Sequence, residues 1–154
     1  MALLTLDATT TTACERRTAE HGSAVGGLHI PIFGAWAIEP IRTALELANL
    51  EAGWDAEGSP PPTREAVRVA INIITVIAEL DIHDLPGPRI VPVPGGGVQL
   101  EWQLGERYLE IEVAPDGSAG YLAVSDTGEE DEQEFPVWAP RQVKDLIDRL
   151  TAAA

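Results

Sequence analysis

The sequence predicts an α+β domain in which a small antiparallel β-sheet, a hairpin or meander, carries helices packed on its apolar face. Residues 98–113 alternate between apolar and polar side chains on both sides of Gly105-Glu106, which predicts a β-hairpin. Residues 63–80 and 140–150 instead place apolar side chains at helical spacing. A length of 154 residues allows one domain with a buried core.

The start of the chain differs in composition from the rest. Residues 1–27 are rich in Thr, Ala and Gly and show no helical period. Such a segment is typical of an N-terminal arm that is flexible or is held by a partner. We therefore expect residues 28–154 to form the single α+β domain. Within it, Pro31 limits the apolar residues 28–36 to an edge strand or an irregular packed segment.

Two helices are expected before the sheet. Pro40 suits the first turn of a helix that ends near Leu50. A loop rich in Gly and Pro follows at residues 51–62, and Thr63 is placed to cap a second helix that ends near Leu80. The few polar residues of this second helix form one narrow stripe, which predicts the buried centre of the fold. It is shorter than the roughly 20 apolar residues of a membrane span, so we expect no membrane insertion.

The hairpin that follows has a defined register. Gly105 readily takes the positive φ that a type II′ turn requires at its first position. With that two-residue turn, one face of the hairpin becomes continuously apolar through three cross-strand pairs, Trp102 with Leu109, Leu100 with Ile111 and Val98 with Val113.

The other face of the hairpin is acidic. The same register sets Glu101 opposite Glu110 and Gln99 opposite Glu112. Like charges across a strand pair repel unless water, a cation or a basic group screens them. This face is therefore either simply solvated or the place where a basic partner sits.

Further strands are expected on both sides of the hairpin. Residues 90–93 predict a short edge strand, and Pro115-Asp116-Gly117 predicts a turn into a third strand at residues 120–125. A three-residue loop would direct Tyr121 and Ala123 inward, whereas a four-residue loop would direct Leu122 and Val124 inward. Hydrophobicity favours the second alternative.

The C-terminal part begins with an acidic run. Residues 126–134 contain six acidic side chains in nine positions, which is typical of a solvated loop. Residues 135–138 predict a short apolar strand or anchor. Pro140 then starts an amphipathic helix with four apolar residues on one face, Val143, Leu146, Ile147 and Leu150.

Charge narrows the class of partner. The chain has 25 acidic and 10 basic residues and a net charge of -15. That charge repels phosphate backbones and anionic membranes, so we expect a basic protein partner and no direct binding of nucleic acid. The single Cys14 excludes an internal disulfide and a cysteine-rich zinc site, and no apolar signal segment precedes it, which predicts a cytoplasmic protein.

Residues typical of catalysis are scattered. His21, His29 and His83 belong to no metal-binding motif, and Cys14 has no histidine beside it. The glycine-dense residues 95–97 precede a strand, so they present no helix N-terminus to a phosphate. We therefore expect no enzyme, no catalytic residue, no metal site and no cofactor.

Three segments are candidates for binding. In the loop at residues 53–62, Trp54 and the acids Asp55 and Glu57 predict a recognition loop or a weak cation site. The favoured interpretation is that Trp54 is an anchor that pins the loop. The acidic hairpin face offers a protein contact or a solvated surface, because acid and base catalysis would need a desolvated cleft. The acidic run is the third candidate. The expected partner-binding acids of these last two segments are Glu101, Glu110, Glu112, Glu129, Glu130, Asp131 and Glu132.

Part of the chain resembles a recurring group of small uncharacterised bacterial proteins. The motifs are Gly53-Trp54-Asp55 with Gly58 and the prolines after it, then Pro92 to Pro94, and then the GGxQLEW pattern of Gly96 to Trp102. The similarity covers residues 50–113. It implies a bacterial origin, and because the group has no assigned activity it implies no functional residue.

These observations favour a non-enzymatic acidic interaction protein. It would act as an accessory subunit or an antitoxin-like inhibitor of a basic protein, and nucleic-acid mimicry is a related version of this hypothesis. One alternative is a cation-dependent hydrolase that uses clustered acidic residues. Another is an oligomer-forming structural protein, which would expose an apolar face on the helix at residues 63–80.

Overall fold

The computed structural model describes residues 35–80, 82, 85–135 and 140–152, which lie within one compact unit, Pro31–Ala154. The expected boundary between arm and domain at residues 27 and 28 lies outside this part. The described elements run in the order η1 (Ala35–Ala37), α1 (Ile38–Leu47), α2 (Arg64–Glu79), β1 (Arg89–Val93), β2 (Gly97–Leu104), β3 (Arg107–Val113), β4 (Ala119–Val124), β5 (Glu130–Phe135) and α3 (Pro140–Thr151).

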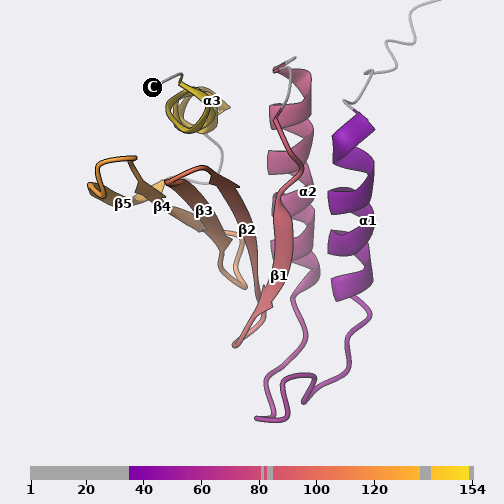
Figure 1. Ribbon diagram of the computed structural model, residues 1–154. Helices are drawn as coiled ribbons and strands as arrows, with labels where there is room; N and C mark the ends of the chain where they lie inside the picture. Colours follow the sequence, from indigo (N-terminus) through magenta and orange to yellow (C-terminus); the bar gives the residue numbers. More distant parts are fainter. Residues whose placement is uncertain (1–34, 81, 83–84, 136–139, 153–154) are drawn as a thin grey trace, which may run out of the picture. The chain divides into compact units, whose positions relative to one another are not determined.

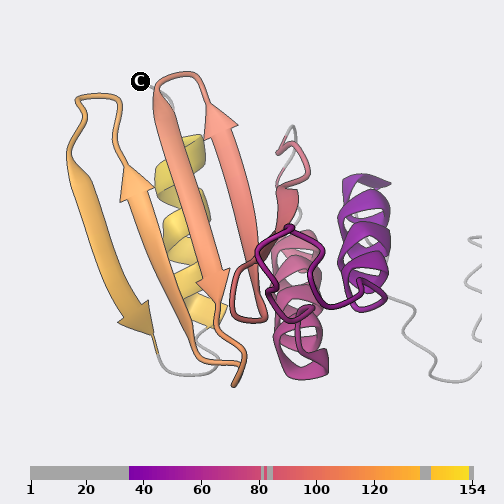
Figure 2. The ribbon, with the colours of Figure 1, turned by 90° about the horizontal axis from the view of Figure 1, so that it is seen from below.

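The five strands form an antiparallel meander in the order β1-β2-β3-β4-β5, so the predicted α+β class is confirmed (Figure 1). Helix α2 contacts β2 and β3, and α3 contacts β3 and α2. Helix α1 packs on α2 and β1. In Figure 2 the strands lie in front of α3, and no described helix crosses in front of β3, β4 or β5. We call the helix side the inner face of the sheet and the opposite side the outer face.

The hairpin of β2 and β3 has the predicted register. Trp102 pairs with Leu109, Leu100 with Ile111 and Val98 with Val113. All six side chains are buried on the inner face. Gly105 has a φ of 61°, as the glycine-first turn requires. A two-residue turn leaves no freedom to slip by one residue, because a slip would send the whole apolar set to the wrong face.

Helix α2 is the central cover of the inner face. Thr63 caps it as predicted, because its Oγ1 accepts the N–H of Ala66 at 3.0 Å. The same hydroxyl donates to the carbonyl of Pro115 at 2.7 Å, which ties the helix start to the turn between β3 and β4. Most of the apolar side chains of α2 are buried. No helix in the described ranges is long and apolar enough to cross a membrane.

Helix α3 completes the inner cover. Its four expected apolar residues, Val143, Leu146, Ile147 and Leu150, are all buried. The edge strand expected near Ile90 is also confirmed as β1, where Ile90 lies opposite Leu100. The core is therefore one layer of apolar side chains between the inner face of the sheet and the helices.

The favoured register of the third strand was wrong. Tyr121 lies opposite Ile111 on the inner face and is buried, whereas Leu122 is on the outer face. The reason is a three-residue loop. Ala114 N–H donates to Ser118 O at 2.8 Å, and Gly117 takes a φ of 86°. A buried tyrosine needs a partner for its hydroxyl, and Tyr121 finds one in Asp131 at 3.0 Å.

The acidic run is not a loop throughout, which corrects a second expectation. Only its first residues form a turn, in which Ser125 N–H donates to Glu129 O at 2.9 Å. The remainder, Glu130 to Phe135, is strand β5 at the edge of the sheet. Of the short apolar strand or anchor expected at residues 135–138, Phe135 is the last residue of β5 and residues 136–138 lie outside the described residues.

Candidate functional site

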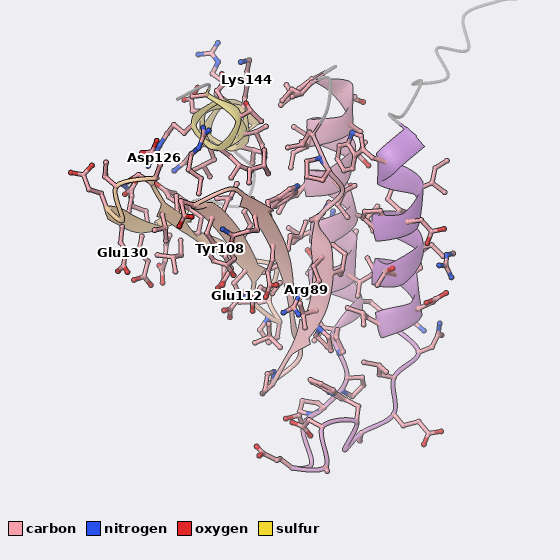
Figure 3. All side chains as sticks on the ribbon, in the orientation of Figure 1. Arg89, Tyr108, Glu112, Asp126, Glu130 and Lys144 are labelled. Carbon is pink, nitrogen blue, oxygen red and sulfur yellow. The ribbon has the colours of Figure 1, made fainter. Side chains whose placement is uncertain are left out.

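The outer face gathers carboxylates from three strands. Because side chains alternate along each strand, pairing aligns Glu110 with Leu122 and Glu132 in one row, and Glu112 with Gly120 and Glu134 in the next. Figure 3 shows Glu112 and Glu130 pointing away from α3. The acidic outer face, as we use the term, consists of Glu101, Glu110, Glu112, Glu130, Glu132 and Glu134.

A shallow hollow lies within this face. Gly120 has no side chain, so the row between Glu112 and Glu134 is empty at its centre. The hollow has a volume of about 480 Å³, and its lining includes Glu110, Glu112, Glu132 and Glu134 around Gly120 and Leu122. The sheet therefore presents a concave, acidic surface rather than a flat one.

Arg89 of β1 relieves the repulsion expected between Glu101 and Glu110. Arg89 Nε lies 2.6 Å from Glu101 Oε2, and Arg89 Nη2 lies 3.1 Å from Glu101 Oε1. Gln99 Nε2 also donates to Glu101 Oε1, at 3.1 Å. Only 16% of the Glu101 side chain is exposed. Glu101 thus forms a bidentate ion pair with Arg89, which leaves it less available to a partner protein than predicted.

Glu110 is satisfied in a different way. The hydroxyl of Tyr108 donates to Glu110 Oε2 at 2.7 Å. Burial and the neighbouring carboxylate raise the pKa of Tyr108 above its usual range, so the hydroxyl stays protonated and keeps donating. This contact orients Glu110 at the rim of the hollow without neutralising its charge.

The other four carboxylates have no such partner. Among the described residues, no ion pair or side-chain hydrogen bond engages the carboxylates of Glu112, Glu130, Glu132 or Glu134. All four residues are exposed. They are the part of the acidic outer face that no described residue pairs.

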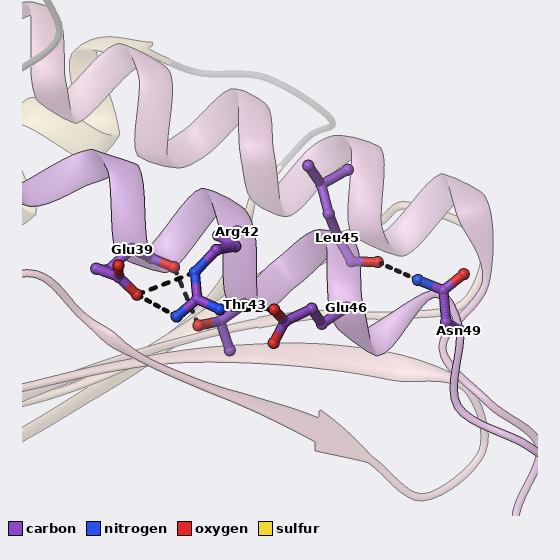
Figure 4. Close-up of polar contacts among 6 residues, drawn as sticks. All are labelled: Glu39, Arg42, Thr43, Leu45, Glu46 and Asn49. Atoms are coloured by element: carbon purple, nitrogen blue, oxygen red, sulfur yellow. Dashed lines mark hydrogen bonds and ion pairs between the residues drawn. The ribbon is translucent and has the colours of Figure 1, made fainter.

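Helix α1 shows the contrasting arrangement (Figure 4). Arg42 lies between two acids and contacts Glu39 Oε2 at 2.5 Å and Glu46 Oε1 at 2.7 Å. Thr43 and Asn49 donate to backbone carbonyls of the same helix. Both acids of α1 are therefore paired with an arginine, whereas no ion pair within the described part of the chain involves the acids around the hollow.

Asp131 belongs to the inner side and not to the acidic outer face. Arg149 Nη1 of α3 contacts its Oδ2 at 2.7 Å, and Tyr121 donates to the same oxygen. Arg149 and then Tyr121 hold the pKa of Asp131 below its usual range. This acid fastens α3 to the sheet. Glu129 lies in the turn before β5, where its N–H donates to Ser125 Oγ at 3.0 Å.

The loop with Trp54 and Asp55 closes on itself. Trp54 Nε1 donates to the carbonyl of Pro60 at 3.1 Å. Asp55 Oδ1 accepts the backbone N–H groups of Glu57 and Ser59. Hydrogen bonds from Ser59, led by its side chain, and from the loop backbone lower the pKa of Asp55. These contacts support the anchor interpretation of Trp54, and they use one oxygen of the acid that a cation would need.

In the described part of the chain, no group of three or more His, Cys, Asp or Glu residues is arranged so that it could hold a metal ion. Cys14, His21, His29 and His83 lie outside it. Sequence reasoning missed Gly120, Glu134, Arg89 and Tyr108 as members of the outer face. Acids occupy positions 129 and 131 as well as 130, 132 and 134, so the local sequence shows no clean alternation that would have indicated a strand there.

A second surface is apolar. The exposed large hydrophobic residues of the described chain are Ile38 and Leu45, at 63% and 53% exposure, and both lie on α1. A groove of about 330 Å³ runs between α1 and α2, with Leu45, Val67 and Ile71 in its lining. Most apolar side chains of α2, the helix on which an oligomer was expected to expose an apolar face, are buried, and the oligomer alternative stays a prediction.

Comparison with family models, curated proteins and solved structures finds no match to this chain. The resemblance carried by the GWD and GGxQLEW motifs therefore stays a prediction.

Proposed function

We propose that this protein is a non-enzymatic binding protein that docks its acidic outer face on a basic surface of a partner protein. In this role it serves as an accessory subunit or an inhibitor, and we place it in the bacterial cytoplasm. The observation that carries the proposal is a set of four outer-face carboxylates that no other described residue pairs, Glu112, Glu130, Glu132 and Glu134, three of which line the hollow at Gly120.

The charges of the acidic outer face favour the docking of a basic partner and work against folding. Carboxylates on neighbouring strands repel one another and weaken the sheet. The same charges, gathered on a concave surface of a chain with net charge -15, raise the local concentration of cations and speed the encounter with a basic surface. The pairing of Glu39 and Glu46 with Arg42 shows that acids elsewhere in this chain do acquire basic neighbours.

The direct test is recovery of the native complex through a tagged full-length chain. One variant removes charge from the outer face, with Glu112→Gln, Glu132→Gln and Glu134→Gln. A matched control changes three exposed acids elsewhere, with Glu51→Gln, Glu57→Gln and Glu79→Gln. Both variants lose the same number of charges, so a difference between them reports position and not net charge.

At low salt, the original chain and the control variant are expected to retain the partner. The outer-face variant is expected to bind on the order of tenfold more weakly or worse. Salt near 1 M is expected to release the partner from every chain, because it screens charges beyond about 3 Å. Equal retention by the two variants, or a chain that purifies without a partner at low salt, contradicts the proposal.

Addition of duplex DNA to the complex separates two versions of this role. If the acidic rows imitate phosphates, DNA displaces the protein from a nucleic-acid groove of the partner. If DNA has no effect while the outer-face variant still loses binding, the protein contact is right and mimicry is wrong.

A further inference from the structure

Strand β5 is the last strand in the order of the five-stranded sheet. It pairs with β4 on one side, and within the described part of the chain no strand pairs with its other side. The opposite edge, β1, contains Pro92, which has no N–H to offer to an added strand. The two edges therefore differ, because β5 has no proline and keeps its full set of backbone groups.

The hydrogen-bond pattern identifies which groups face outward. Pairs in an antiparallel ladder alternate between bonded and non-bonded. Ser125 and Glu129 form a bonded pair at the start of the β4–β5 ladder. The pairs of Val124 with Glu130, Leu122 with Glu132 and Gly120 with Glu134 are then the non-bonded ones. Consequently Glu130, Glu132 and Glu134 direct both N–H and C=O away from β4.

These are the same three residues whose carboxylates lie on the outer face. An antiparallel strand added to β5 would bond to their backbone groups, and its residues opposite them would place their side chains on the same face. Favourable pairing there needs Lys or Arg at every second position. The requirement follows from alternation alone and does not depend on the identity of the partner.

We infer that β5 accepts an extended segment of a basic protein, with Lys or Arg at alternate positions, as an added strand of the sheet. The inference rests on the proposed function and names the form of the partner. A basic side chain opposite Glu134 reaches the rim of the hollow, which Glu132 and Glu134 line on the side of β5. A second copy of this chain is a poor occupant, because its own β5 would bring glutamates against glutamates.

The test uses three labelled peptides of alternating lysine and threonine and measures their binding to the full chain by fluorescence anisotropy at low salt. One peptide is unmodified, one is N-methylated at every lysine, and one is N-methylated at every threonine. N-methylation removes a backbone donor but leaves the charge in place. In an added strand only one of the two sets of N–H groups faces β5.

Strand addition predicts that the unmodified peptide binds and that the lysine-methylated peptide loses on the order of tenfold or more in affinity, because the lysine N–H groups are the ones that face β5. The threonine-methylated peptide should stay close to the unmodified one, and a loss confined to it overturns the inference. Equal binding of all three peptides overturns strand addition but leaves the acidic face as a charge-driven surface, so the proposed function survives. If none of them binds while the native complex is still recovered, β5 is only an edge protected by charge, and the inference is wrong.

Discussion

The two faces of the sheet are built from the same strands and do opposite things. On the inner face Leu100, Leu109 and Ile111 are buried under α2 and α3. One residue along, on the outer face, Glu110 is half-buried and Glu112 is exposed. Alternation with a period of two thus places residues that hold the fold together next to residues that do not.

The difference separates stability from binding. Burial of an Ile or Leu side chain contributes about 1.5–3 kcal/mol to folding. The exposed acids offer no comparable gain, and their mutual repulsion opposes folding. Substitutions on the inner face should therefore lower the free energy of unfolding, whereas substitutions on the outer face should weaken binding. The largest effect on stability comes first.

The largest effect is expected at the centre of the inner face. Ile111→Ala removes a fully buried side chain between β3 and the helices and should lower the free energy of unfolding by about 2–5 kcal/mol. Glu112→Gln, one residue along, is the matched control and should leave it nearly unchanged. Urea denaturation of both variants measures the difference. Similar losses at the two positions would show that the faces are not energetically distinct.

A smaller loss is expected where α2 meets the turn between β3 and β4. Thr63→Ala removes the cap of α2 and the bond to Pro115, and should cost about 1 kcal/mol, within the usual 0.5–2 kcal/mol for such caps. Thr63→Ser keeps a hydroxyl and should recover most of the stability in the same denaturation experiment. A full loss in the serine variant would mean that the methyl group, and not the hydrogen bonds, is what matters.

The sequence predicted the inner face better than the outer one, for physical reasons. In the β2–β3 hairpin a two-residue turn and strict alternation fix the register together, so every pair was correct. In β4 the register depended on loop length. Hydrophobicity ranked Leu122 above Tyr121, but a tyrosine with a partner for its hydroxyl is as good a core residue.

Strand β5 was hidden by its charge. Glutamate and aspartate are depleted in strands, so the run looked like a solvated loop. Its strand conformation comes from pairing with β4, which local sequence does not reveal. Likewise, nothing local indicates that Asp131 faces Arg149 while Glu130 and Glu132 face the other way, or that Arg89 relieves the contact between Glu101 and Glu110.

Two acids of β5, Asp131 on the inner side and Glu132 on the outer face, allow the faces to be compared by the pH dependence of stability. The pKa of Asp131 is lowered from its ordinary value of 3.8 in the folded protein. Its stabilising contribution is therefore complete above about pH 4 and is lost as the pH falls through the lowered folded pKa. Asp131→Asn should lower the melting temperature at neutral pH, and the gap to the original chain should close below pH 4.

The neighbouring substitution Glu132→Gln is the control for this pH effect. It removes an exposed carboxylate of the outer face and should leave the neutral-pH melting temperature nearly unchanged. Thermal melts of both variants across the acid range provide the measurement. A gap for Asp131→Asn that persists undiminished in acid would mean that the ion pair with Arg149 is not its origin.

The smallest stability effect is expected from the outer face as a whole. The combined variant Glu112→Gln, Glu132→Gln and Glu134→Gln relieves repulsion, so its melting temperature should be equal to or slightly above that of the original chain at low salt. The difference should shrink as salt is added, because the repulsion is screened. A clear loss of stability would mean that these acids support the fold, against the separation of roles described above.

The central claim is that a basic partner docks on the acidic outer face and not on the groove between α1 and α2. Nuclear magnetic resonance mapping of the full chain during titration with the alternating lysine and threonine peptide tests it most directly. We predict that the largest shifts cluster on Glu112, Glu132, Glu134 and Gly120 and disappear at high salt. Shifts that instead gather around Ile38 and Leu45 would contradict it.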